Sequence, residues 1–490
     1  MTMGIKFSYA KVGTFENFPY IDPRDLLEHI VDQGFFHRVL GLQVEVAEKS
    51  LVKFWDIFRL LHPRHPIFDQ YFELQHVIPY YLHGDGGRGF KKEAVEIFSM
   101  LPCLGSGSRK RAIHLAGPKA KRAYDEADED CTLGINLRGI TATTRFLFTV
   151  LGSLVAKNHP DAFDGIAELW GKRLQSLFLE GFMVRGQVWR IAIVGFTEDS
   201  PFVKKMAHMK RTFHNVRKRG PILQYMLLEE DDAPSFFRPD LFHVYHSGVG
   251  KDFLGSSFIY AIQILLNRGG VDRNIQALND LLKAFLRRTK LYLHCRTLSP
   301  DTLGYSSTKE YPEGHWSKNQ DTAVLMRFLV ELLEDHPRSV SSDAMLTEML
   351  LAARAMGNFM RTSFQADYFM SSADCQKLLR SGHQSLMGYR RLASFSYDKG
   401  LCLYKLKPKI HYLNHIVLTV KEQWLASGTA VNPVAEATFM SEDFVGQIAR
   451  ASRRVNAKVV TKKTLQRYDL MLKAALDNEE LSLLDLSWID

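Results

Sequence analysis

The pattern of apolar and polar positions divides the chain into segments with different predicted structures. Apolar residues at helical spacing, as in the run LVKFWDIFRLL, predict a helical N-terminal region over residues 1–75. Two short apolar runs, 76–83 and 93–104, predict strands on either side of a glycine-rich turn. A polar, charged and glycine-rich stretch then predicts a flexible loop over 105–139.

Beyond this loop, the pattern predicts one strong strand among many helices. Residues 141–183 read as two helices, whereas the run QVWRIAIVGF at 187–196 is the best strand in the chain. A basic helix is predicted over 201–219. Amphipathic helices fill 240–425 and return in 432–475.

Together these elements predict an α/β fold in which helix predominates. The first part of its core spans 76–220 and contains a small mixed sheet. The segment 240–425 is then a long helical insertion, and 432–475 is a helical part that completes the core.

Composition narrows the class of protein. The 490 residues are 46% apolar and 24% charged, which are globular proportions. The net charge of +9 favours a polyanionic partner such as nucleic acid. The five cysteines form no CxxC pair, which favours a reducing, intracellular compartment. No run of about 18 apolar residues occurs, so we expect no membrane span.

The glycine-rich segment GDGGRG, residues 84–89, raises the question of a phosphate-binding loop. Gly84, Gly86 and Gly89 match the GxGxxG pattern of nucleotide-binding enzymes. Two residues argue against this interpretation. The carboxylate of Asp85 would face a pyrophosphate, and Pro79 lies in a strand that would have to be central. A nucleotide-binding enzyme without a GK[ST] signature therefore stays a distant alternative.

Two aspartates follow predicted strands and suggest a different chemistry. Asp85 comes after YYLHG, and Asp199 comes after RIAIVGFTE. Paired carboxylates at strand ends hold two Mg²⁺ ions in RNase H-like cores, where the ions activate water against a phosphodiester. The competing interpretation is that each aspartate merely caps a turn.

A third acidic ligand is ambiguous from sequence. Glu442, next to Asp443, opens a predicted helix in SEDFVGQIAR, and Asp321 opens another in SKNQDTAVLMRFL. Either acid could be a first-turn residue favoured by the helix dipole beside a serine cap. We prefer Glu442, because it leaves 240–425 as an insertion between the second and third acids, and we retain Asp321 as the alternative ligand.

Basic residues near the two aspartates are candidate phosphate contacts, with a solvated basic face as the alternative. The candidates are Arg88, Lys91, Lys92, Lys204, Lys205, Lys210, Arg211 and Arg217. Histidines form a rival site. His411 and His415 are spaced for one helix face, and His243 and His246 are three apart, but a zinc site needs a third ligand. A packing role for these histidines is favoured.

Several motifs in order along residues 60–470 carry a resemblance to a known family. They are HGDGGRGFKK, TATTRFLFTVL, EDSPFVKKMAHMKRTFHNV, DLFHVYHSGVGKDFLGS, KPKIHYLNHIV and NPVAEATFMSEDFVGQIARASRRV. The chain resembles a multi-copy family of transposon-derived protist proteins, which are distantly similar to cut-and-paste DNA transposases with a DDE, RNase H-like core. The resemblance implies metal-binding roles for Asp85 and Asp199, with Glu442 as third acid.

The chain also departs from that family. Glu198 stands before Asp199, where the family often has glycine, and no Cys-x-x-Cys segment follows the basic helix. The resemblance therefore implies a transposase-like, metal-dependent DNA nuclease or strand transferase in a decayed copy. The alternative is a non-catalytic nucleic-acid-binding relic or domesticated protein.

The expected cofactor is Mg²⁺ or Mn²⁺, with no organic cofactor. The expected partner is DNA and not a membrane, which places the protein in the nucleus. A homodimer is left open.

Overall fold

The computed structural model describes residues 4–89, 93–107, 133–198, 200–208, 220–228, 235–318 and 320–486. The chain divides into two compact units, each described by itself. Unit 1 comprises residues 1–240, 367–369 and 435–490. Unit 2 comprises residues 241–366 and 370–434. Most of the predicted loop 105–139 lies outside the described residues. Its described ends form isolated bridges, Leu104 with Ile135 and Gly107 with Asn136.

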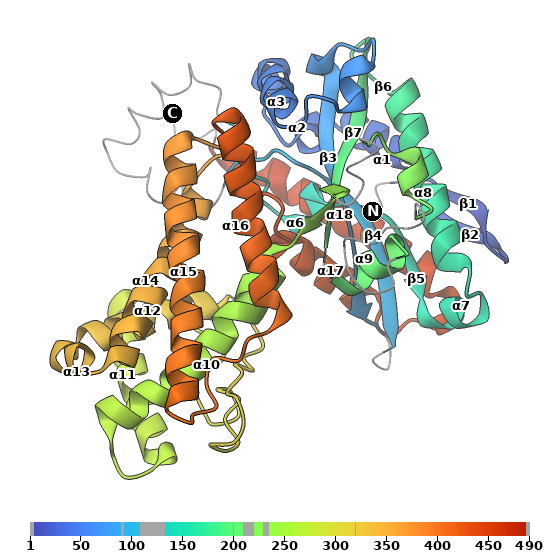
Figure 1. Ribbon diagram of the computed structural model, residues 1–490. Coiled ribbons are helices and arrows are strands. Elements are labelled where there is room, and N and C mark those ends of the chain that lie inside the picture. The colour runs from blue at the N-terminus through green and yellow to red at the C-terminus, as the bar shows by residue number, and fades with distance from the viewer. Residues whose placement is uncertain are drawn as a thin grey trace. The chain divides into compact units, whose positions relative to one another are not determined.

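Unit 1 is built on a mixed sheet of six strands (Figure 1). In spatial order, β5, β4, β3, β7 and β6 lie side by side, and β8 pairs with the other end of β7. The β5–β4–β3 ladders are antiparallel, whereas β3–β7 and β7–β8 are parallel. The strands are β3 (Val77–Arg88), β4 (Ala94–Pro102), β5 (Phe146–Gly152), β6 (Phe182–Val184), β7 (Gln187–Glu198) and β8 (Phe237–Pro239).

Helices cover both faces of this sheet. On one face, Trp170 of α8 packs against Phe98, Phe148 and Phe196 of three strands. On the other face, Thr461 of α18 donates a hydrogen bond to the Val150 carbonyl. The first face carries α8 (Ala162–Glu180) and α9 (Ser200–Met206), and the second carries α17 (Phe439–Ser452) and α18 (Val460–Leu486).

Smaller elements complete unit 1. Its remaining strands and helices are β1 (Phe7–Val12), β2 (Phe15–Ile21), α1 (Pro23–Asp32), α2 (Phe36–Leu40), α3 (Ala47–Leu61), α6 (Thr141–Thr144) and α7 (Ser153–Asn158). Single 3₁₀ turns cover Val44–Val46, Pro66–Asp69, Leu74–His76, Leu223–Tyr225 and Ala457–Val459.

Unit 2 is helical. Its helices are η7 (Phe242–Val249) and η8 (Ile262–Leu266), both of π type, α10 (Gly250–Ala261), α11 (Val271–Thr289), α12 (Asp321–Glu334), α13 (Pro337–Ser342), α14 (Ala344–Gln365), α15 (Ser372–Asp398) and α16 (Pro408–Ser427). The short strands in this part of the chain are β9 (Phe369–Met370) and β10 (Ala430–Val431). Among the described residues, one continuous helix, 242–266, is long and apolar enough to cross a membrane, and 72% of its most apolar window is buried inside the protein.

The structure confirms the predicted α/β class with predominant helix and a mixed sheet. The predicted strands at 76–83, 93–104 and 187–196 are β3, β4 and β7. The helix predicted through the start of 141–183 is wrong, because Phe146–Gly152 forms the buried strand β5. The hairpin β1–β2 within the predicted helical region 1–75 was also missed. Of the predicted basic helix 201–219, α9 ends at Met206, and 209–219 lie outside the described residues.

The glycine-rich segment is not a turn. Residues 84–88 are the second half of β3 and pair with β4 as far as Arg88 opposite Ala94. This extended backbone contains no helix N-terminus, which the phosphate-loop interpretation required. The argument from Pro79 was also wrong, because β3 is central. Pro79 pairs with Ala192, and the β3–β7 register shifts just after it.

A substitution pair tests the packing of β3. A Cβ atom at Gly84 would overlap the ring of Phe202, which is 3% exposed, whereas one at Gly86 would meet nothing closer than 3.9 Å. Gly84→Ala should therefore lower the free energy of unfolding by about 1–3 kcal/mol through overpacking. The control Gly86→Ala should leave it unchanged or raise it by about 0.5–1 kcal/mol. Urea unfolding checks both, and equal losses in the two variants would contradict the packing described.

Candidate active site

Asp85 lies in the middle of the sheet, on the face covered by α17. Gly84 faces Phe202 of α9, and side chains alternate along a strand, so Asp85 and Gly87 share the opposite face. The Asp85 carboxylate is half-exposed and accepts a hydrogen bond of 2.6 Å from the Gly86 amide through Oδ1. A strand position fixes this carboxylate more firmly than the predicted turn would.

Helix α17 packs directly on this face of β3. A Cβ at Gly87 would lie 2.6 Å from the Ala449 Cβ, and one at Gly89 would lie 2.9 Å from the Ser452 hydroxyl. Only glycine therefore allows the helix to approach so closely. Gly87 meets Ala449, and Gly89, further along the chain, meets Ser452. The helix α17 and the strand β3 therefore run in the same direction.

The helix that packs on this face also carries Glu442. Glu442 precedes Ala449 by seven residues, so both lie on one face of α17, about 10 Å apart along the axis. Asp85 precedes Gly87 by about 7 Å along β3. Helical spacing therefore puts Glu442 on the side of α17 that packs on the face of β3 presenting Asp85. Glu442 is half-buried, in the first turn of the helix as predicted.

A buried contact fixes the start of α17. The residue that caps the helix is Thr438 and not the predicted Ser441, which lies inside it. The Asp240 carboxylate, 4% exposed, accepts hydrogen bonds from the Thr438 amide (3.0 Å) and hydroxyl (2.5 Å). Asp240 follows β8 directly, so the strand next to β7 holds the helix that carries Glu442. Sequence reasoning missed Asp240, whose only signal was an aspartate after a short apolar run.

Asp443, the neighbour of Glu442, has a structural role. Its Oδ2 atom accepts hydrogen bonds from the Thr141 hydroxyl (2.9 Å) and the Gln447 amide (2.7 Å). These contacts tie α17 to α6. Asp443 thus helps to position the helix that carries Glu442.

The second predicted aspartate follows β7. Thr197 pairs with His83 on β3, two residues before Asp85, and β7 continues to Glu198. Asp199 itself lies outside the described residues. Within the described part of the chain, no group of three or more acidic, histidine or cysteine side chains is placed to hold a metal ion.

The alternative third acid, Asp321, belongs to unit 2. It is 1% exposed, and its carboxylate accepts hydrogen bonds from the His294 amide (3.0 Å) and the Cys295 amide (2.9 Å). Its Oδ1 also lies 2.9 Å from His294 Nδ1. Asp321 thus links the start of α12 to residues His294 and Cys295, which follow α11.

The predicted phosphate contacts are only partly described. Arg88 is exposed at the end of β3, and Lys204 is exposed on α9. Lys205, also on α9, forms an ion pair with Glu96 of β4, on the face opposite Asp85. The others, Lys91, Lys92, Lys210, Arg211 and Arg217, lie outside the described residues.

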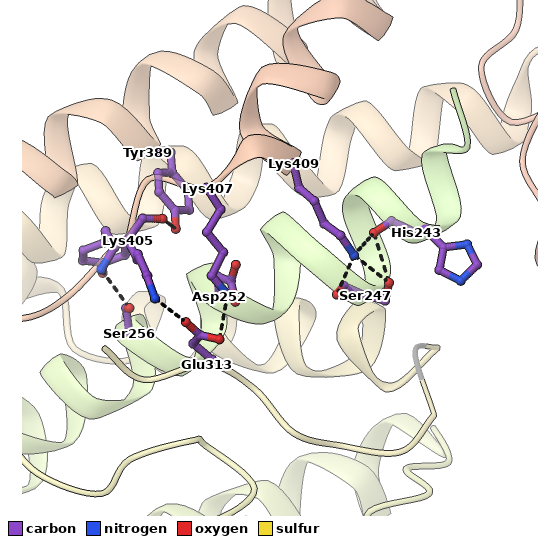
Figure 2. A network of polar contacts seen from close by, with 10 residues as sticks. His243, Ser247, Asp252, Ser256, Glu313, Tyr389, Lys405, Lys407 and Lys409 are labelled. Carbon is purple, nitrogen blue, oxygen red and sulfur yellow. Dashed lines mark hydrogen bonds and ion pairs between the residues drawn. The ribbon is translucent and has the colours of Figure 1, made fainter. Parts of the chain in front are cut away.

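The lysines of the KPKIHYLNH motif hold unit 2 together (Figure 2). Lys407 lies 3.0 Å from the Asp252 carboxylate and 2.7 Å from that of Glu313, which Lys405 approaches to 3.3 Å. Lys409 donates to the His243 carbonyl at 3.0 Å. The figure shows Lys405 and Lys407, just before α16, reaching Glu313 and Asp252 of α10, and Lys409 reaching His243 and Ser247 of η7. Their partners are internal, which argues against phosphate binding.

The two histidine pairs lie in unit 2 as well. His411 and His415 of α16 have their Nε2 atoms 2.9 Å apart. His246 is 3% exposed in η7, and its ring lies near Phe242. No third ligand joins either pair among the described residues.

A buried polar cluster lies in unit 1 on the same strand as Asp85. The hydroxyls of Tyr81 and Tyr368 are 2.5 Å apart, and Tyr81 also contacts Glu436 at 3.5 Å. Arg238 Nε lies 3.4 Å from the Glu436 carboxylate. Burial raises the pKa of Glu436, and Arg238 opposes that shift.

Two histidines next to this cluster are held neutral. Burial, reinforced by the positive charge of Arg238, lowers the pKa of His62 to about 3 and that of His65 to about 4. His62 packs against Phe58, with ring centres 4.6 Å apart. The folded protein therefore excludes two protons that an unfolded chain would bind.

No protein-family model matches the chain, and the curated proteins contain no significant match to it.

The histidine pKa values predict acid sensitivity. Both lie below the unfolded value of about 6.5, so stability is fully present above pH 6.5 and falls as the pH drops toward 3. Each histidine contributes about 1.4 kcal/mol per pH unit in that range. His62→Phe should reduce the slope of the unfolding free energy against pH by the equivalent of one proton. The exposed control His208→Gln should leave that slope unchanged. Parallel curves for wild type and His62→Phe would exclude this role.

The Asp240–Thr438 contact predicts coupling between two residues. Asp240→Ala and Thr438→Val should each destabilise the protein, because each leaves a buried polar group without its partner, at about 1–3 kcal/mol. The double variant should lose less than the sum, by about 0.5–3 kcal/mol. Unfolding of the four proteins in urea measures this difference, and strict additivity would show that the contact does not hold α17.

Proposed function

We propose that the protein is a metal-dependent DNA nuclease or strand transferase of the transposase type, with an RNase H-like core. Asp85 of β3, Asp199 after β7 and Glu442 of α17 are its acidic residues. The observation that supports the proposal is the packing of α17, the helix that carries Glu442, on the face of β3 that presents Asp85.

The topology of unit 1 supports the RNase H-like core. Three consecutive antiparallel strands, β3, β4 and β5, precede the covering helix α8. Then β7 joins β3 in parallel, β8 joins β7 in parallel, and the last helices return to the sheet. The strands β3 and β7 are thus neighbours at the centre of the sheet. Asp85 and Asp199 each stand two residues beyond the last β3–β7 pair, His83 with Thr197, so the two acids would share one end of this parallel ladder.

The residues have the chemistry that a hard cation needs. Mg²⁺ and Mn²⁺ prefer carboxylate oxygens, and the three proposed acids would hold the ion. Once bound, such an ion polarises a phosphodiester and lowers the pKa of its water. The chain's own contribution is to fix the carboxylates, Asp85 by the strand and Glu442 by the Asp240–Thr438 contact.

A second candidate function is DNA binding without catalysis. The replacement of the family's usual glycine by Glu198, directly before Asp199, favours it. The two functions share the DNA partner and differ in whether the acids are needed.

Cleavage of a DNA duplex in Mg²⁺ or Mn²⁺ separates the candidates. Asp85→Asn, Asp199→Asn and Glu442→Gln should each reduce the rate by about 10³-fold, because a metal site contributes several kcal/mol to transition-state stabilisation. Asp280→Asn, an exposed acid of unit 2, is the matched control and should cleave like wild type.

Equal rates for Asp85→Asn and Asp280→Asn would contradict the nuclease. A wild-type protein that binds DNA but does not cleave it in either metal would support the non-catalytic function instead.

A further inference from the structure

The C-terminal helices of unit 1 carry a strongly basic segment that the predicted phosphate contacts did not include. Between Phe444 and Tyr468 the chain has seven cations and no acidic residue. All seven are exposed. They lie on the last turn of α17, the connection to α18 and its first two turns, and they are Arg450, Arg453, Arg454, Lys458, Lys462, Lys463 and Arg467. These seven residues are called the α17–α18 basic surface.

Backbone contacts fix part of this surface in place. The Arg467 guanidinium donates hydrogen bonds to the carbonyls of Ala451 (2.5 Å) and Arg453 (2.9 Å), which joins α18 to the end of α17. Arg453 in turn donates to the Arg88 carbonyl at 3.4 Å. The surface is therefore continuous with the end of β3. Such guanidinium groups keep their charge while their orientation is restricted.

The charge of this surface is not compensated within the described residues. None of its seven cations forms an ion pair there, and neither does Arg88. The Lys405–Lys407 group of unit 2 is the opposite case, because carboxylates lie against both of its cations (Figure 2). Uncompensated positive charge on a rigid surface attracts a polyanion.

The location of the surface identifies which polyanion it fits. Arg450 of the basic surface follows Glu442 by eight residues on α17. The surface also adjoins Arg88, which follows Asp85 by three residues on β3, through the Arg453–Arg88 contact. Along α17, eight residues span about 12 Å, which is several phosphates of one DNA strand. A duplex whose backbone crosses the proposed acids would therefore continue onto these cations.

We propose that the α17–α18 basic surface binds the phosphate backbone of duplex DNA. This inference rests on the proposed function for the identity of the polyanion. It does not depend on catalysis. Contacts with phosphates alone are independent of sequence and weaken steeply with salt, because binding releases condensed counterions.

Binding of a fluorescent DNA duplex in EDTA, over a range of salt concentrations, tests this proposal. The variant Lys458→Gln/Lys462→Gln/Lys463→Gln removes three charges whose side chains form no hydrogen bond in the described structure. Its control, Lys283→Gln/Lys309→Gln/Lys377→Gln, removes three exposed lysines of unit 2. The first variant should lower the slope of log K against log salt by about 2.7, or 0.9 for each lost contact, and raise Kd at 0.1 M salt by at least about tenfold. The control should match wild type.

The outcomes separate this inference from the proposed function. Equal salt slopes of DNA binding for the two triple variants would overturn the proposal that the α17–α18 basic surface binds DNA. The proposed nuclease function would be unaffected. The predicted loss of salt slope in a protein that does not cleave DNA would support DNA binding by the basic surface and contradict the proposed nuclease function. A wild-type protein that binds phosphatidylserine vesicles but no duplex would overturn the inference in favour of a membrane.

Discussion

The packing of α17 on β3 is the contact on which the account of unit 1 depends. It is possible because Gly87 and Gly89 leave room for Ala449 and Ser452 of the helix. A side chain at either glycine would push the helix away from the sheet. The close approach joins the helix that carries Glu442 to the strand that carries Asp85, and it brings the end of α17 beside Arg88. One glycine-dependent contact thus positions both the proposed acids and the basic surface.

Parts of this arrangement could be predicted from local sequence. The apolar run of β7 is rich in β-branched residues and predicts a strand, and the structure confirms this prediction. The position of Glu442 at a helix start also follows from local pattern, because helix periodicity resumes just after it. The predominance of helix in 240–425 rests on the same periodicity. These predictions needed no knowledge of what packs against each element.

The remainder depended on contacts between distant segments. The run FLFTVLG could form a helix or a strand, and only its pairing with β4 makes it β5. Glycines at 84, 86 and 87 suggested a turn, although their pairing with β4 makes them strand residues. Pro79 argued against a central strand, but it pairs with Ala192 of β7 and stands just before the β3–β4 ladder, which begins at Tyr80. Asp240 and Thr438 are 198 residues apart, so no local pattern could reveal their contact.

The proposed function requires Asp85 and Glu442 to lie close enough across the α17–β3 contact to share a cation. Anomalous diffraction from crystals soaked in Mn²⁺ measures this directly. The account predicts a single strong peak bounded by oxygens of both carboxylates, at distances of about 2.0–2.3 Å. A separation of more than about 10 Å between the two carboxylates would contradict it, because neither one metal ion nor two neighbouring metal ions could bridge that distance.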